Sequence, residues 1–461
     1  FLALIYLFQT LVFPIFFVSR SNKFYYCYKE NYILRSLFLI TACIMLIQCD
    51  KFYQSGGENH YTEWKHYLGD PGRSHYSQLS EFTSKNIKSL KVAWEYESKD
   101  YGQMQMNPIV IDTLLYGVSS ALRVFALDAR SGEEVWVFGD TLKTLFSTSR
   151  GVSYWESGND KRIFYTKGAD LWALNAHTGQ PIPSFGKGGK IDLRSGLHAS
   201  AQDKFVISST PGTIYKNLII MPIRLSEGVG AAPGDVMAFD VITGELAWSF
   251  HTLPRPGETG IETWGDPNIS ESPIVGAANN WAGMALDQKR EILFVPTGSA
   301  SPDFYGALRP GKNLYSNCLL ALNANTGKLL WHYQFIHHDL WDRDLPAPPN
   351  LITVNHGGKK IAAVAQVTKQ GYVFVFDRET GQPLFDIEEV AVPESELPGE
   401  QTWPTQPVPV KPASFARQSD KLTTEDISPF APNRDSLIAL FEQSDKRNFA
   451  PPSLEPALLL P

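Results

Sequence analysis

The chain has 461 residues, of which 43% are hydrophobic, 12% aromatic and 19% charged. This composition supports a large buried core and excludes a chain that is disordered throughout. The 41 basic and 48 acidic residues give a formal net charge of −7, which argues against a protein that binds nucleic acid through bulk positive charge.

Two apolar stretches lie near the N-terminus, at residues 1–18 and 36–47, with a basic segment between them. The second stretch has the length of a signal-peptide hydrophobic region, and it ends at Cys49 in a sequence that resembles a loose lipoprotein box. We predict that residues 1–49 form a hydrophobic leader of a periplasmic, membrane-anchored protein, held by lipidation of Cys49 or by an N-terminal helix. A further interpretation is that residues 1–28 are translated upstream sequence and belong to no mature protein.

Three of the four cysteines fall in this leader, so Cys318 is the only thiol in residues 50–461. The sequence predicts no internal disulfide there, and it contains neither a C-x-x-C-H haem-attachment motif nor a zinc-type cysteine pair. The adjacent His337 and His338 also do not indicate zinc, because neighbouring residues of a strand point to opposite faces.

A seven-residue pattern occurs five times, each time after a run with the alternation of a β-strand. Its third residue is Asp or Asn, which accepts backbone hydrogen bonds within a turn, and its last is Gly, which takes the positive φ that such a turn needs. The pattern therefore predicts five hairpin turns. The five copies are Ala126–Gly132, Ala173–Gly179, Ala238–Gly244, Ala321–Gly327 and Val375–Gly381.

An aromatic residue follows the glycine by four positions in four of the five copies, at Trp136, Trp248, Trp331 and Phe385, whereas Pro183 stands there in the remaining copy. A large ring at a fixed offset after a hairpin is suited to packing between neighbouring sheets. Together with scarce helical periodicity, these repeats predict an all-β fold built by radial repetition, as in a β-propeller.

The repeats resemble the tryptophan-docking repeats of quinoprotein dehydrogenases, which bind pyrroloquinoline quinone (PQQ). The resemblance covers the chain from about Trp64 to the end. It opens with residues 64–94 and includes the string His337–Pro346 (HHDLWDRDLP), which is similar to the glucose-dehydrogenase-like branch. It implies an eight-bladed propeller with PQQ on its axis. Residues 50–461 are then an incomplete PQQ-binding propeller with about five to six blades present and the C-terminal blades missing.

Oxidising an alcohol or hemiacetal requires a base for the hydroxyl proton and an acceptor for the hydride. No G-x-G-x-x-G motif opens a βαβ unit here, so a nicotinamide site is not supported. The resemblance supplies a quinone instead, and it implies Asp342 as the general base. Asp339 and Asp344 match positions without that role.

The resemblance also implies the residues that bind the cofactor. Lys369 matches a cationic contact to the quinone oxygens, where it would stabilise developing negative charge. Arg150 matches an arginine near the carboxylates of PQQ, and Trp281 aligns with the tryptophan on which the planar ring stacks. Ser209 and Thr210 are expected to offer hydroxyls.

A calcium ion, or Mg²⁺ in its place, is implied as the metal, because hard cations prefer oxygen ligands. The resemblance assigns Glu227, Ser299 and Asp342 as its ligands. Related enzymes often carry Asn where Ser299 stands.

The sequence therefore predicts a PQQ- and calcium-dependent oxidoreductase that oxidises the CH–OH group of a sugar or alcohol. Electrons would pass to a membrane quinone or a separate cytochrome, and no nucleic-acid partner is expected. The alternative is a non-catalytic propeller scaffold, such as an outer-membrane assembly lipoprotein, which would have no reason to hold Asp342, Lys369, Arg150 and Glu227 together.

Overall fold

The computed structural model describes residues 63–140 and 148–455, and the predicted leader at residues 1–49 lies outside them. The described residues are organised almost entirely in antiparallel sheets. Helix α3 (Arg434–Gln443) is the one α-helix in these ranges. Short 3₁₀ turns lie in the connections, at Ile87–Ser89, Leu193–Gly196, Ala199–Ala201, Ile261–Thr263, Ile269–Glu271, Ser419–Lys421 and Thr424–Asp426.

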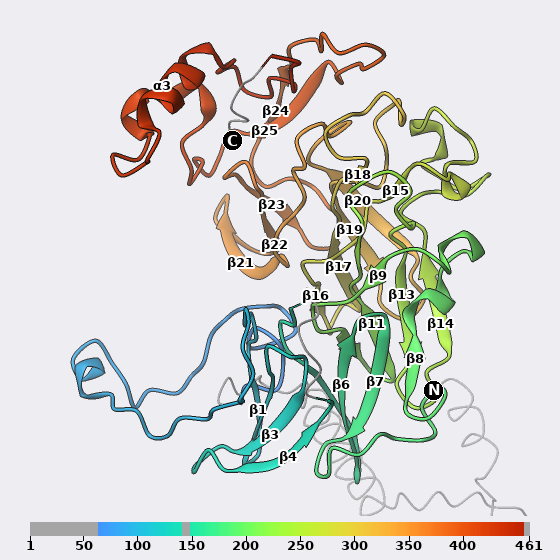
Figure 1. Cartoon of the computed structure of the whole chain (residues 1–461), viewed down its shortest axis with the longest axis vertical. Helices are drawn as coiled ribbons and strands as arrows, with labels where there is room; N and C mark the ends of the chain where they lie inside the picture. The colour runs from blue at the N-terminus through green and yellow to red at the C-terminus, as the bar shows by residue number, and fades with distance from the viewer. Residues whose placement is uncertain (1–62, 141–147, 456–461) are drawn as a thin grey trace, which may run out of the picture. The chain divides into compact units, whose positions relative to one another are not determined.

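Five sheets, here called blades 1 to 5, follow one another in chain order (Figure 1). Blade 1 contains β1 (Ile109–Ile111), β2 (Leu114–Val118), β3 (Val124–Asp128) and β4 (Glu134–Phe138). Blade 2 contains β5 (Ser153–Ser157), β6 (Asp160–Lys167), β7 (Asp170–Asn175) and β8 (Lys190–Asp192). Blade 3 contains β10 (Thr213–Tyr215), β11 (Leu218–Met221), β13 (Val236–Asp240) and β14 (Leu246–Phe250).

Blade 4 contains β16 (Ala285–Asp287), β17 (Ile292–Pro296), β19 (Cys318–Asn323) and β20 (Leu329–Gln334). Blade 5 has three strands, β21 (Asn350–His356), β22 (Lys359–Val367) and β23 (Val373–Asp377). Three two-stranded pairs complete the set: β9 (Val206–Ile207) with β12 (Arg224–Leu225), β15 (Gly276–Ala277) with β18 (Ala300–Ser301), and β24 (Ile387–Ala391) with β25 (Thr405–Pro409).

The hydrophobic core is divided among the spaces between successive blades. One cluster joins Ile109 and Val124 of blade 1 to Ile163 of blade 2, and the next joins Phe164 of blade 2 to Phe239 of blade 3. Two further clusters join blade 3 to blade 4 and blade 4 to blade 5. Sheets that pack face to face in sequence are the arrangement of a propeller, which confirms the predicted all-β class.

The five repeated turns have the predicted structure. In every copy the Asp or Asn side chain accepts hydrogen bonds from the backbone N–H groups two and three residues later. The glycines have φ between 68° and 78°, and each glycine N–H donates to the carbonyl of the Asp or Asn over 2.8 to 3.0 Å. Each turn therefore satisfies its own polar groups.

The repeated tryptophans tie blades 1, 3 and 4 to the blades that follow them, as predicted. The indole of Trp136 in blade 1 donates to the Ala176 carbonyl of the next turn over 3.0 Å. Trp248 and Trp331 make the same contact to Ala324 and Arg378, over 3.3 and 3.0 Å. A Cβ on the turn glycine would overlap the docked ring at each of these positions. Glycine is therefore required for the close approach of the ring.

The seam between blades 2 and 3, where the repeat has Pro183, is held by a different residue. Arg162 of β6 is only 4% exposed, and it donates from Nη1 to the carbonyl of Val241 over 2.9 Å. Its guanidinium also lies 5.6 Å from the ring centre of Trp155 and pairs with Asp160. Val241 follows Asp240 of the repeat, so Arg162 takes the hydrogen-bonding role of the missing tryptophan.

The strand order separates the two ends of each blade. Because neighbouring strands are antiparallel, the segment that enters the first strand lies at the same end as the link between the second and third strands. The repeated turn, which follows the third strand, lies at the opposite end. We call these the cavity end and the repeat end, for the reason given in the next subsection.

Candidate active site

Connections at the cavity end of the blades line one cavity of about 570 Å³. The segments that enter the first strands contribute Gln105, Arg150, Ser209, Trp281 and Asp342 in chain order. The links between second and third strands contribute Ser120, Glu227, Ser299 and Lys369. Antiparallel topology thus brings together residues from all five blades that are up to about 260 positions apart.

Arg150 and Trp281 form an aromatic and cationic wall of this cavity. The guanidinium carbon of Arg150 lies 5.4 Å from the ring centre of Trp281, and Nη1 donates to the Ser209 and Thr210 hydroxyls over 3.0 and 3.1 Å. Burial lowers the pKa of Arg150. In the described part of the chain its side chain pairs with no carboxylate, so a cation faces the cavity without a counter-ion.

Asp342 and Lys369 form a second group. Asp342 lies in the loop between β20 and β21, at a φ of 55°, a left-handed conformation that Asp tolerates better than most residues. Lys369 Nζ donates to both the carbonyl oxygen of Asp342, over 2.7 Å, and its Oδ2, over 3.1 Å. Burial alone would lower the pKa of Lys369, but the charges of Asp344 and Asp342 outweigh it and raise that pKa.

Carboxyl groups crowd the cavity and change each other's ionisation. Burial raises the pKa of Asp303 to about 8, and the negative charges of Asp342, Asp344 and Glu227 act in the same direction. Burial likewise raises the pKa of Asp342 to about 6, with Asp344 adding to the rise and Lys369 opposing it. Four carboxyl groups therefore share a space that a cation would stabilise.

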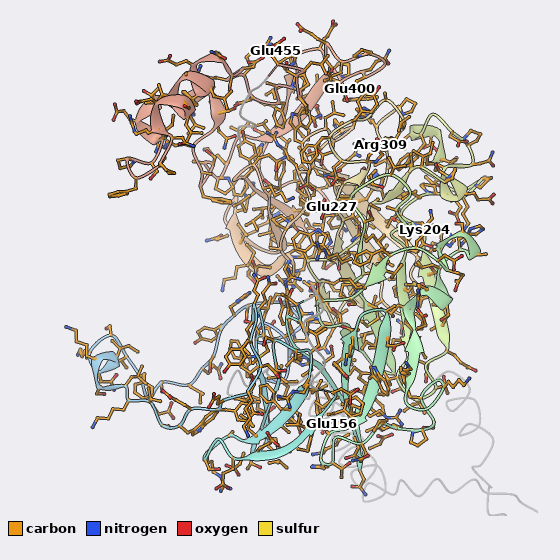
Figure 2. The ribbon with its side chains drawn as sticks, in the orientation of Figure 1. Glu156, Lys204, Glu227, Arg309, Glu400 and Glu455 are labelled. Atoms are coloured by element: carbon orange, nitrogen blue, oxygen red, sulfur yellow. The ribbon has the colours of Figure 1, made fainter. Side chains whose placement is uncertain are left out.

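The predicted metal ligands differ in how they are held. Glu227, labelled near the middle of the view in Figure 2, lines the cavity with a side chain that is 71% exposed, 4.0 Å from Arg224. Ser299 is buried, and its hydroxyl donates to Asp339. No three His, Cys, Asp or Glu side chains form a ready chelating group in the ranges that the structure describes. The oxygen-only donors nevertheless suit a hard cation, which would also relieve the carboxyl repulsion.

The structure brings most of the predicted site residues together. Arg150, Ser209, Glu227, Trp281, Ser299, Asp342 and Lys369 all line the cavity. Thr210 lies behind its wall, 1% exposed, with a hydroxyl that donates to the Trp281 carbonyl over 2.7 Å and accepts from Arg150. Lys369 belongs to the tight turn between β22 and β23.

Two further carboxylates line the cavity: Asp303, which the sequence analysis did not identify, and Asp344, to which it gave no role. Asp303 stands four residues after Ser299, a predicted metal ligand. Asp344 stands two residues after Asp342, so alternation along an extended segment would have placed both on one side. Asn279 and Arg224 also line the cavity, and no motif pointed to them.

His337 and His338 bond to neighbouring groups of the fold. His337 contacts Gln334 and Glu389, and His338 donates from Nδ1 to the Gly311 carbonyl over 2.7 Å. Cys318 is a buried free thiol. None of the helices in the described ranges combines the length and the mean hydropathy of a membrane-spanning segment.

Comparison with known proteins agrees with the motifs. The family model described as glucose/ethanol/alcohol dehydrogenase, PQQ β-propeller domain, matches residues 64–461. The quinoprotein glucose dehydrogenase of Escherichia coli strain K12 is 32% identical over 376 residues, which cover 75% of this chain and 46% of that protein. The quinate/shikimate dehydrogenase (quinone) of Acinetobacter baylyi is also 32% identical, over 78% of this chain and 48% of its own length.

Among solved structures, the quinohemoprotein alcohol dehydrogenase of Comamonas testosteroni superposes with a TM-score of 0.63 at 25% identity, over 78% of this chain and 53% of that one. The chain thus spans about half the length of the relatives it matches. It belongs to the PQQ-dependent glucose/ethanol/alcohol dehydrogenase family, with residues 64–461 as its β-propeller domain, as the repeats and the His337–Pro346 string predicted.

Proposed function

We propose that this protein is a PQQ- and calcium-dependent dehydrogenase that oxidises the CH–OH group of a sugar or alcohol. One observation carries the proposal: a cation with no carboxylate partner among residues 63–140 and 148–455, an indole face and a Lys–Asp pair line a single cavity of about 570 Å³. A planar ligand with several carboxylates matches that combination of stacking surface and guanidinium.

Different cavity residues would bind different parts of PQQ. Trp281 would carry the flat ring system, and Arg150 would pair with a carboxylate of the cofactor, oriented by the hydroxyls of Ser209 and Thr210. Glu227, Ser299 and Asp342 would hold the calcium ion. When bound, PQQ supplies the acceptor for the hydride that leaves the substrate carbon.

Residues of the chain itself would remove the hydroxyl proton of the substrate. Asp342 takes the hydroxyl proton of the substrate on its carboxylate, since the substrate oxygen must lose that proton as the hydride departs. Lys369, bonded to Oδ2 and to the carbonyl of Asp342, keeps this carboxylate ionised and fixes its orientation. Burial, with the negative charge of Asp344 acting in the same direction, raises the pKa of Asp342 and makes it a stronger base.

Substrates and partners follow the same reasoning. Relatives are named for glucose, quinate or shikimate, and glycerol, which all carry CH–OH groups, and we propose a substrate of this class. Electrons would leave to a membrane quinone or to a separate cytochrome. We further propose a periplasmic, membrane-anchored location.

The test is reconstitution of the full chain with PQQ and Ca²⁺, followed by a screen of aldoses, polyols and alcohols with an artificial electron acceptor. We expect oxidation that needs both additions and is lost on chelation. Oxidation that persists without PQQ would overturn the proposal. A folded chain that fails to bind PQQ would instead favour the non-catalytic scaffold.

A further inference from the structure

The carboxylate of Asp344 joins three of the segments that line the cavity. Its Oδ2 accepts the indole N–H of Trp281 over 2.8 Å, and its Oδ1 accepts the backbone N–H of Ser299 over 2.5 Å. Lys369 Nζ lies 3.8 Å from Oδ2. The Asp344 side chain is 16% exposed, so these contacts lie mostly out of solvent, where a charge-assisted hydrogen bond is strongest.

The backbone around Asp344 is shaped for this approach. An added Cβ on Gly298 would stand 2.9 Å from the Asp344 Cγ, closer than real Cβ atoms come to other carbon atoms. Gly298 has no left-handed φ that would otherwise explain a glycine. The missing side chain at position 298 therefore makes room for the carboxylate rather than for an unusual backbone conformation.

Trp281 depends on this contact for its orientation. Its backbone carbonyl accepts a hydrogen bond from Thr210, which fixes the main chain, but the rotation of the indole about its side-chain bonds needs a second anchor. The Nε1–H bond to Asp344 supplies that anchor at the far end of the ring, and Arg150 lies against the ring face.

We infer that Asp344 is a positioning residue, which fixes the plane of the Trp281 indole and the Ser299 backbone before any ligand enters. The inference rests on the proposed function where it concerns PQQ, and it deepens that proposal. Asp344 acts through Trp281, and its effect on PQQ affinity arises from keeping the stacking surface in place rather than from contact with cofactor or metal.

The first experiment needs no cofactor. The full chain is labelled with ¹⁵N at its tryptophan indoles, and the Trp281 signal is assigned from its absence in Trp281→Phe. In Asp344→Ala we expect the Trp281 N–H resonance to move upfield and its exchange with D₂O to accelerate about 10-fold or more, because the charged acceptor is gone. The indole of Trp331, which donates to Arg378, should not change.

If Asp344→Ala folds poorly, two further variants allow the same measurement. Asp344→Asn keeps the shape but offers one acceptor oxygen to two donors, so an intermediate shift is expected. Gly298→Ala leaves the carboxylate intact and displaces it, and it should move the same signal. Asp303→Asn removes another carboxylate of the cavity that does not contact Trp281, and it should leave the signal in place. An unmoved Trp281 signal in Asp344→Asn and Gly298→Ala would overturn the inference.

The second experiment measures PQQ affinity in a double-mutant cycle. Asp344→Asn should weaken PQQ binding about 10-fold in the natural background and much less in the Trp281→Phe background, where no indole N–H remains. An equal loss in both backgrounds would mean that Asp344 does not act on PQQ through the Trp281 indole and would overturn the inference. If the natural chain binds no PQQ, the proposed function fails, and the indole resonances still decide the positioning role.

Discussion

The repeat end and the cavity end of the blades are formed by the same strands, but the polar side chains at the two ends have different kinds of partner. At the repeat end, each Asp or Asn bonds to its own turn, and each docked ring donates to a carbonyl of the next blade. At the cavity end, Arg150 faces the cavity with no carboxylate partner among the described residues, and Asp303 and Asp342 have raised pKa values. Polar groups that pair within and between turns hold the blades together, whereas charged groups with perturbed pKa values gather around the candidate site.

The largest expected effect contrasts the same chemical change at the two ends. Asp342→Asn should lower kcat for PQQ-dependent oxidation by about 10²- to 10⁴-fold, because the amide cannot take the hydroxyl proton. Its free energy of unfolding should change little. Dye-linked assays at saturating PQQ and urea unfolding measure the two quantities.

Asp240→Asn is the matched control at the repeat end. Asn already occupies this position in two of the five repeats, at Asn175 and Asn323, and makes the same turn bonds. We expect neither activity nor stability to change measurably. A loss of activity in Asp240→Asn comparable to that of Asp342→Asn would break the distinction between the ends.

A second prediction removes a docked ring. Trp248→Ala should lower the free energy of unfolding by about 3–5 kcal/mol, because it opens a cavity between blades 3 and 4. Trp248→Phe keeps the ring and loses only the bond to Ala324, at a cost of about 1 kcal/mol. Urea unfolding checks both values, and an Ala variant as stable as the natural chain would contradict the role of the seam.

The third prediction concerns a buried carboxyl that lies at the cavity end but does not line the cavity. Asp235 precedes β13, one of its carboxylate oxygens has no hydrogen-bond partner in the structure, and burial raises its pKa from 3.8 to about 6. The fold therefore favours the protonated form, and stability falls as pH rises from about 4 to 6. Above pH 6 the ionised group costs up to about 3 kcal/mol.

Asp235→Asn should thus raise the free energy of unfolding at pH 7.5 by up to about 3 kcal/mol. The gain should shrink as pH falls toward 4, and activity should stay unchanged. Urea unfolding at pH 7.5 and 4.5 tests the sign. A variant that loses activity at full stability would show that Asp235 belongs with the cavity residues.

The smallest predicted effect is a shift in pH dependence. Lys369 lowers the pKa of Asp342 against the effects of burial and Asp344, so Lys369→Met should raise that pKa and move the acid limb of the activity profile upward by roughly one pH unit. Activity should fall most below pH 7. The comparison is made at saturating PQQ against Lys216→Met, whose lysine pairs with Glu291 outside the cavity. An unshifted acid limb would argue against Asp342 as the base.

The two ends also differ in how far the sequence predicts them. The repeat end follows from short-range patterns, because each Asp, Gly and Trp acts within one turn or on the next one. The seam between blades 2 and 3 was beyond such patterns: Arg162 lies in β6, outside the repeat, and only packing brings it to Val241. Arg150, Trp281, Asp342 and Lys369 were identified because their local strings resemble a family.

The sequence did not predict the roles of Asp303 and Asp344, because these roles depend on residues that are distant in the sequence. Burial is the main cause of the raised pKa of Asp303, and two distant loops add to the rise: the loop between β20 and β21 through Asp342 and Asp344, and the loop between β12 and β13 through Glu227. Asp344 looked like a spare carboxylate in a motif, and its contact with an indole 63 residues away becomes visible only in three dimensions.

The contacts between successive blades also have a consequence for how the chain folds. The hydrogen bonds that join each blade to the repeated turn of the next connect residues 40 to 79 positions apart, from Trp136 with Ala176 to Arg162 with Val241. Each core cluster likewise draws mainly on two successive blades. Folding can therefore proceed blade by blade behind the growing chain, as in repeat proteins. The cavity, which needs residues from all five blades, is the last part to form.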